Sequence, residues 1–316
     1  MPAPTLNQVA LKWSEYGRAR ADEVFANQIS ELKRQSAFLA QRAKAMEAVA
    51  AGGGPLAGQL LVQAPAGFLI AQGDSWFSYG SGANDIPGLL MAQGYEVNRE
   101  AAHAGSRIYD MATVGLDAFL TIIGRALTSG RIPKAILLSG GGNDVGNRKT
   151  MPDVLLPATP AKRGVNMPEL RKVIDGDIQN AYVAILDGIT QTCLKYLPKP
   201  IPILVHGYDH PVPDGRPVLF CWLKPGFDKR GYPNLEENKG HMVTIIDTFN
   251  DMILRLPTLQ DGQGKRRFEH VVHVEVRGAL STKAADYQQD WSNELHPTQP
   301  GFAKVTDKFV KVLERL

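Results

Sequence analysis

The sequence has little of what marks several common classes of protein. It holds only two cysteines in 316 residues, Cys193 and Cys221, and neither belongs to a Cys-x-x-Cys pair. A His-Glu-x-x-His motif is also missing. Metal sites built on these patterns are therefore excluded, and we expect neither a metal nor a cofactor.

Strong charge and long apolar runs are missing as well. The formal net charge is only +3, and the short basic run at residues 265–267 is typical of a solvated loop, so we expect no nucleic-acid partner. No stretch approaches the roughly 20 apolar residues that span a bilayer, so we expect no transmembrane segment. Since no cleavable secretory signal is seen, we expect a cytoplasmic protein, with export without a cleavable signal as the alternative.

Apolar strand-like runs alternate with helical patterns over most of the chain. We expect strands near residues 67–72, 95–98, 135–139, 201–206 and 270–276, and helices at 108–127, 170–196, 240–256 and 301–316. Such alternation is typical of a mostly parallel sheet with helices on both faces. The predicted fold class is therefore α/β, in three layers α/β/α around a five-stranded sheet.

Two of the expected strands end in polar groups. The first runs into Gly73-Asp74-Ser75, and the third runs into Gly140-Gly141-Gly142-Asn143-Asp144. Ligands bind in the crevice beyond the carboxyl ends of such strands. Ser75 is therefore a candidate nucleophile, although a Gly-Asp-Ser tripeptide is more often an ordinary turn.

A serine becomes a nucleophile only when a base removes its proton. Of the seven histidines, His296 is the best candidate, because it precedes Pro297 and the C-terminal helical segment. Its simpler interpretation is a capping or surface residue.

These pieces, in this order, resemble the SGNH or GDSL hydrolase family. Gly73-Asp74-Ser75 matches the first block of that family, residues 141–144 match the third, and His296 with Pro297 matches the last. Gly105 is the best match to the glycine of the second block. The resemblance spans residues 67–316 and implies a flavodoxin-like α/β fold. It also implies an ester hydrolase that acts through an acyl-enzyme, with an oxyanion hole made by the N–H groups of Ser75 and Gly105 and the side chain of Asn143.

The sequence departs from the family at the acid of the last block. That block is Asp-x-x-His, whereas the residue three before His296 is Asn293. Replacing this aspartate by asparagine in the serine-protease template costs about 10⁴ in turnover. We expect Asp290 to reach the imidazole through a turn, while Glu294, a backbone carbonyl or a water remain alternatives.

Two long irregular stretches, residues 145–168 and 207–239, follow predicted strands and are rich in proline or aromatic residues. Loops this long are usually functional or disordered. We expect them to form a wall or lid of a substrate pocket, together with Trp76, Phe77, Tyr208 and His210. The same aromatic residues are equally typical of ordinary core.

The first 50 residues show helix-like recurrence of apolar side chains, and the run Gly52-Gly53-Gly54-Pro55 ends it. We therefore divide the chain into an N-terminal helical extension, residues 1–54, and a hydrolase domain, residues 55–316. The extension could pack on its own domain, join two subunits or touch a membrane surface. Packing on its own domain is the simplest interpretation, because helical stripes usually face a core.

Three functions are compatible with these residues. The first is a serine-dependent carboxylic ester hydrolase, an esterase or lipase acting on small-molecule or lipid-like esters. The second is a carbohydrate O-deacetylase, and the third is a binding module that keeps the fold with a degraded triad. Asn293 is the residue that keeps the third alternative open.

Overall fold

A single sheet of five parallel strands forms the centre of the molecule. The computed structural model describes residues 6–47, 66–216 and 221–316. The strand order is β2-β1-β3-β4-β5, with bounds β1 Gly67–Gly73, β2 Tyr95–Ala102, β3 Ala135–Leu138, β4 Ile203–His206 and β5 Val271–Val274. The five predicted strands are therefore confirmed. β3 and β4 are wholly buried runs rich in branched residues, as strands covered on both faces should be.

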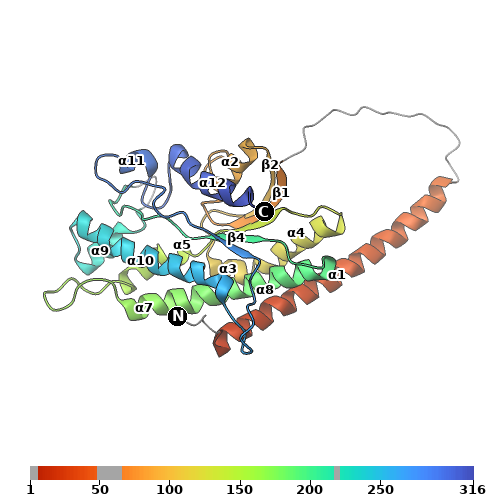
Figure 1. Ribbon diagram of the computed structural model, residues 1–316, viewed down its shortest axis with the longest axis horizontal. Helices are drawn as coiled ribbons and strands as arrows, with labels where there is room; N and C mark the ends of the chain where they lie inside the picture. The colour runs from red at the N-terminus through yellow and green to blue at the C-terminus, as the bar shows by residue number, and fades with distance from the viewer. Residues whose placement is uncertain (1–5, 48–65, 217–220) are drawn as a thin grey trace.

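Helices cover both faces of this sheet, so the predicted three-layer α/β/α fold is confirmed (Figure 1). Helices α2 (Ile86–Ala92) and α12 (Gln299–Leu313) pack together on one face. On the other lie α3 (Ile108–Ala112), α4 (Leu116–Thr128), α8 (Gln179–Tyr196) and α10 (Leu235–Arg255). Side chains of Asp85, Asn234 and Thr298 cap the first turns of α2, α10 and α12, which fixes where these helices begin.

Two predicted helices are each divided into shorter helical elements. The segment 108–127 divides into α3 and α4, because the backbone turns at residues 113–115, where the N–H of Gly115 donates to the carbonyl of Asp110. The segment 170–196 begins earlier, with α7 (Met167–Arg171), and passes through a π-helical stretch, η1 (Lys172–Ile178), before α8. A short 3₁₀ turn, η2 (Leu256–Thr258), follows α10.

The strand order reverses beside β1, and this reversal creates the crevice where ligands bind in such sheets. The first crossover leads from β1 outward to β2, and the next returns to β3 on the other side of β1. The strand ends are level, since Gly73 pairs with Ala102 and Gln72 with Leu138. The loops that follow β1, β2 and β3 therefore leave the sheet at one edge.

Helix α1 (Gln8–Glu47) lies outside this domain and packs against α8 and α4. Its contacts are partly ionic: Arg18 lies 3.5 Å from Asp187, and Asp22 lies 2.5 Å from Lys195. Packing on its own domain is thus confirmed for the first half of α1, while the second half extends beyond the domain (Figure 1). The predicted domain boundary at residue 54 lies outside the described residues. Among the described helices, none combines the length and the apolar character that a membrane span needs.

The two irregular stretches contain short helices and tertiary contacts. The first follows α5 (Gly142–Val145) and holds α6 (Thr150–Asp153) and an antiparallel bridge between Leu155 and Val165. The second holds α9 (Lys224–Arg230), and residues 217–220 within it lie outside the described part. The Tyr232 hydroxyl joins the two stretches by donating to the carbonyl of Leu156, 2.9 Å away. A last short helix, α11 (Tyr287–Asp290), precedes the loop that carries His296.

Candidate active site

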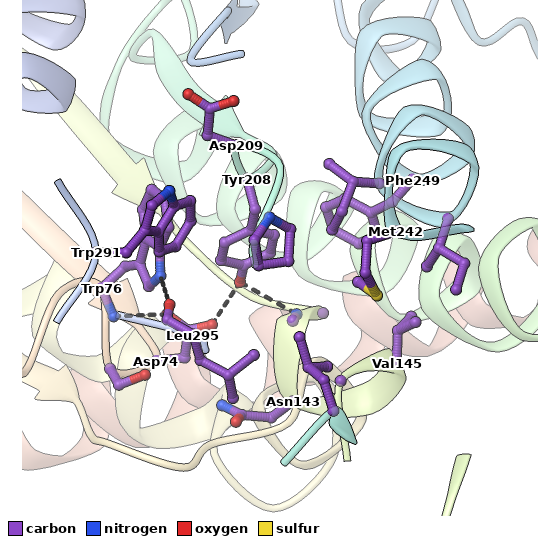
Figure 2. A pocket seen from close by; sticks show the side chains of 18 residues that line it. Asp74, Trp76, Asn143, Val145, Tyr208, Asp209, Met242, Phe249, Trp291 and Leu295 are labelled. Atoms are coloured by element: carbon purple, nitrogen blue, oxygen red, sulfur yellow. Dashed lines mark hydrogen bonds between the residues drawn. The ribbon is translucent and has the colours of Figure 1, made fainter. Parts of the chain in front are cut away.

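Ser75 lies in a tight turn directly after β1, and the buried carboxylate of Asp74 fixes this turn. One oxygen of Asp74 accepts hydrogen bonds from the N–H of Trp76 and the hydroxyl of Ser139, both at 3.0 Å. The other accepts from the hydroxyl of Tyr208, as Figure 2 shows. Burial raises the pKa of Asp74 above its ordinary value. Because these partners follow β1, β3 and β4, Asp74 ties three strand ends together around the candidate nucleophile.

The structure brings Ser75 and His296 into direct contact. The Oγ of Ser75 lies 2.7 Å from the Nε2 of His296. Both side chains are largely buried, at 8% and 7% exposure. This distance suits proton transfer from a hydroxyl to an imidazole.

The other ring nitrogen of His296 faces Asn293. The Oδ1 of Asn293 lies 3.0 Å from the Nδ1 of the ring and also accepts from the backbone N–H groups of Leu295 and His296, at 2.9 Å each. Because two backbone donors point at this atom, it must be the amide oxygen, so the ring nitrogen facing it carries a proton. The Nε2 atom is then bare and can accept the proton of Ser75. The group that faces this ring nitrogen is therefore a neutral amide and not a carboxylate.

Aromatic rings surround the imidazole of His296. The ring of Tyr79 stacks on it with centroids 4.4 Å apart and planes inclined by 19°. The indole of Trp222 meets it edge to face at 5.7 Å. Burial among these groups lowers the pKa of His296 to about 4, because loss of contact with water disfavours the charged imidazolium. The neutral amide of Asn293 adds no negative charge to oppose this shift.

The prediction that Asp290 holds the imidazole is wrong in geometry. The carboxylate of Asp290 accepts from the N–H of Ser281 at 2.8 Å and pairs with the ammonium of Lys304 at 2.6 Å. The expected turn does form, since Trp291 bridges to Pro297. However, it directs Asp290 toward α12 and places Asn293 beside the ring.

Glu294 does not reach the imidazole either. Its carboxylate is wholly buried and accepts four backbone N–H groups at 2.7–3.1 Å. The donors are Gly215, Trp222, Leu223 and Lys224. Glu294 thereby fastens the segment that carries Trp222 against the histidine loop. The loop around His296 thus holds two buried carboxylates, and both stabilise structure.

The other predicted site residues converge on the same edge of the sheet. Gly105 lies in the turn after β2 with φ of 81°, a left-handed conformation that favours glycine, and a Cβ there would point into open space. Asn143 donates through Nδ2 to the carbonyl of Ser106 at 3.0 Å. Its neighbour Asp144 accepts from the N–H of Ile108 at 2.9 Å, and burial raises the pKa of Asp144 to about 6. The turns after β2 and β3 are therefore joined beside Ser75.

A small apolar cavity of about 50 Å³ opens from Ser75 and Asn143. Of the predicted pocket residues, Trp76 and Tyr208 line it. Phe77 does not, because its ring is fully buried between His206 and Phe309. His210 does not either, because its ring binds Asp247 at 2.9 Å.

Sequence reasoning missed the wall of this cavity opposite Trp76 and Trp291. Figure 2 shows Met242 and Phe249 of α10 on that side. Ile245 and Ile246 of the same helix also line the cavity. The helical periodicity of residues 240–256 indicates an apolar face, but not what that face contacts.

Among the comparisons with known proteins, only the one with solved structures gave matches. No family model matches the chain, and no curated protein matches it. Similar solved structures include a lipolytic protein of the G-D-S-L family from Veillonella parvula, at 11% identity and a TM-score of 0.42 over 79% of this chain and 99% of that one. An α/β hydrolase from the metagenome of Lake Arreo has 15% identity and a TM-score of 0.41 over 79% and 96%. The acetylxylan esterase Axe2 from Geobacillus stearothermophilus has 13% identity and a TM-score of 0.38 over 79% and 94%.

The strand order and the site define the class of this protein from its own residues. It is a doubly wound α/β protein with a serine–histidine pair at the carboxyl edge of the sheet, beside the strand-order reversal. In the order of its motifs, the chain resembles the SGNH or GDSL hydrolases.

Proposed function

We propose that this protein is a serine-dependent carboxylic ester hydrolase. The observation that supports this proposal best is the 2.7 Å contact between the Oγ of Ser75 and the Nε2 of His296, with the protonated Nδ1 directed at Asn293. In the proposed reaction His296 takes the proton of Ser75 as the hydroxyl attacks an acyl carbonyl. It then gives that proton to the departing alcohol, and water hydrolyses the acyl-enzyme by the same steps.

Negative charge develops on the carbonyl oxygen during both attacks. We propose that the N–H groups of Ser75 and Gly105 and the amide of Asn143 receive it, since all three follow neighbouring strands at one edge. One preorganised donor of this kind is worth about 3 to 4 kcal/mol in the transition state. The bond from Asn143 to Ser106 fixes the amide in advance, so little reorganisation is needed.

The cavity favours a short acyl group over a lipid chain. It is lined mainly by apolar side chains, and its volume of about 50 Å³ suits an acetyl group or one slightly longer. This volume is also the observation that favours the second candidate, a carbohydrate O-deacetylase. The two candidates differ in the alcohol that leaves, so p-nitrophenyl esters and acetylated sugars distinguish them.

The experiment that tests this proposal compares wild type with Ser75→Ala on p-nitrophenyl esters from acetyl to palmitoyl and on acetylated sugars. Wild type is expected to prefer acetyl esters, and Ser75→Ala is expected to lose at least ~10³-fold in kcat. A fluorophosphonate probe should label wild type at Ser75 and leave the variant unlabelled. If neither protein turns over any ester and neither reacts with the probe while both are folded, the binding-module alternative replaces the proposal.

A further inference from the structure

Tyr79, which belongs to none of the motifs described above, contacts both His296 and Asn293. Its ring stacks on the imidazole at 4.4 Å. Its hydroxyl oxygen accepts a hydrogen bond of 3.2 Å from the Nδ2 of Asn293. Tyr79 therefore contacts the face of the imidazole and also binds Asn293, the residue at the edge of the imidazole.

The position of Tyr79 is itself fixed by buried groups. Its backbone N–H donates to Asp85 at 2.9 Å. Asp85 is fully buried, pairs with Arg99 at 2.5 Å and caps helix α2. Behind Tyr79 lies the ring of Phe302, with centroids 5.8 Å apart. The tyrosine is thus held in place before any substrate binds.

An amide beside an imidazole has a weakness that a carboxylate does not have. A carboxylate presents oxygen on either side, whereas an amide that rotates by 180° presents NH₂ to the ring and stabilises the wrong tautomer. In this loop two backbone N–H groups hold the oxygen of the amide, and the acceptor on its NH₂ side is the hydroxyl of Tyr79. The aromatic face of Tyr79 also attracts the imidazolium that forms when His296 takes a proton.

We propose that Tyr79 is a positioning residue for His296, which together with Asn293 does the orienting part of the missing carboxylate's work. Its hydroxyl helps the two backbone N–H donors keep the oxygen of Asn293 toward the ring, and its aromatic face keeps the ring aligned with Ser75. The consequence for catalysis rests on the proposed ester hydrolysis, whereas the consequence for the histidine tautomer does not.

The first test measures the histidine directly, without any substrate. In protein labelled with ¹⁵N-histidine, the signal of His296 is assigned by its loss in His296→Gln. Wild type is expected to hold His296 as the Nδ1–H tautomer at neutral pH. Tyr79→Ala is expected to keep this tautomer as the major one, since two backbone N–H groups still hold the oxygen of Asn293, but to add a minor Nε2–H population. An unchanged Nδ1–H tautomer in folded Tyr79→Ala would overturn the proposal, whether or not the protein hydrolyses any ester.

The second test asks whether Tyr79 acts through Asn293. Tyr79→Phe keeps the ring and removes the hydroxyl, so it should fold normally and lower kcat about fivefold while KM changes less than about twofold, as expected when one hydrogen bond is lost. In the Asn293→Asp background the same change should have less than about half of that effect, because a carboxylate has no NH₂ group to orient. Equal losses in both backgrounds, or a change in KM alone, would contradict this role.

A matched control comes from a tyrosine far from the site. Tyr196→Phe removes a hydroxyl that donates to Gln28 at 2.8 Å between α8 and α1. It should leave the tautomer of His296 and kcat unchanged. If Tyr196→Phe lowers kcat as much as Tyr79→Phe does, the effect of Tyr79 is one of general stability and the proposal fails.

Discussion

The turn around Ser75 and the loop around His296 meet where the Oγ of Ser75 lies 2.7 Å from the Nε2 of His296. The two segments differ in where they place their buried carboxylates. On the serine side, Asp74 lies directly beside the nucleophile and joins three strand ends. On the histidine side, Asp290 and Glu294 are equally buried but bind Lys304 and backbone N–H groups, away from the ring. The residue that faces the ring is the neutral Asn293.

This difference separates two tasks that one aspartate performs in the serine-protease template. There the aspartate both selects the tautomer of the histidine and stabilises the imidazolium by its charge. Asn293 can do the first, because its oxygen accepts the proton on Nδ1. It cannot do the second. We therefore expect a correctly assembled but weakly basic site, and three predictions test this comparison.

The largest effect is expected from restoring the charge. Asn293→Asp should raise kcat/KM about 100-fold at pH 8, less than the ~10⁴-fold that the aspartate is worth in the template, because the tautomer is already correct. The variant should fold normally, since the carboxylate can accept the same three N–H groups. The measurement is kcat/KM on p-nitrophenyl acetate beside Asn293→Ala, which should be slower than wild type. No gain in a folded Asn293→Asp would mean that charge does not limit this site.

The same comparison explains which parts of the structure the sequence could predict. The five strands and the positions of Ser75, Asn143 and His296 depend on apolar periodicity and on strand ends, which are local properties of the chain. The partner of His296 depends on which side chain of a turn points inward. Asp290 points elsewhere because Ser281 and Lys304, on either side of this loop in the sequence, bind it.

Side-chain direction also limits prediction of the pocket. Trp76 and Phe77 are consecutive aromatic residues after the nucleophile, yet only Trp76 lines the cavity. The N–H of its indole donates to the carbonyl of Leu295 at 3.0 Å, and this contact across the site sets its direction. The contact of Tyr79 with His296 could not be predicted for the same reason, since nothing near Tyr79 in the sequence indicates that its ring will stack on the imidazole.

The pH dependence of the rate should reveal the weak base. The proposed catalysis needs His296 neutral, and burial lowers the pKa of His296 to about 4. The rate of wild type should therefore be constant from about pH 8 down to about pH 5 and fall tenfold per unit only below its pKa of about 4. In Asn293→Asp the new charge raises the pKa of His296, so the acid limb should move to higher pH. Coinciding profiles of kcat/KM from pH 3.5 to 8 would contradict this account.

The smallest effect on rate is expected from Asp290→Asn, because the carboxylate of Asp290 binds the N–H of Ser281 and the ammonium of Lys304 rather than the imidazole. The change keeps an oxygen for Ser281 and removes the charge opposite Lys304, whose side chain is 51% exposed. The rate should therefore stay within about twofold of wild type. The midpoint of thermal unfolding should fall by no more than a few degrees. This is the expected effect of losing an ion pair worth up to about 1 kcal/mol, since the lysine partner is half exposed to solvent.

Lys304→Met is the matched control for Asp290→Asn, because it removes the other half of the same ion pair. It should lower the unfolding midpoint more than Asp290→Asn does, because it leaves the buried carboxylate without its counter-charge, and it should cause no loss of rate. A loss of more than about 100-fold in kcat by folded Asp290→Asn, with Lys304→Met unaffected, would return Asp290 to the catalytic role that the sequence first indicated. Small effects of both variants on the rate would instead place Asp290 with Glu294, as a buried carboxylate that holds the histidine loop in shape while the neutral Asn293 faces the ring.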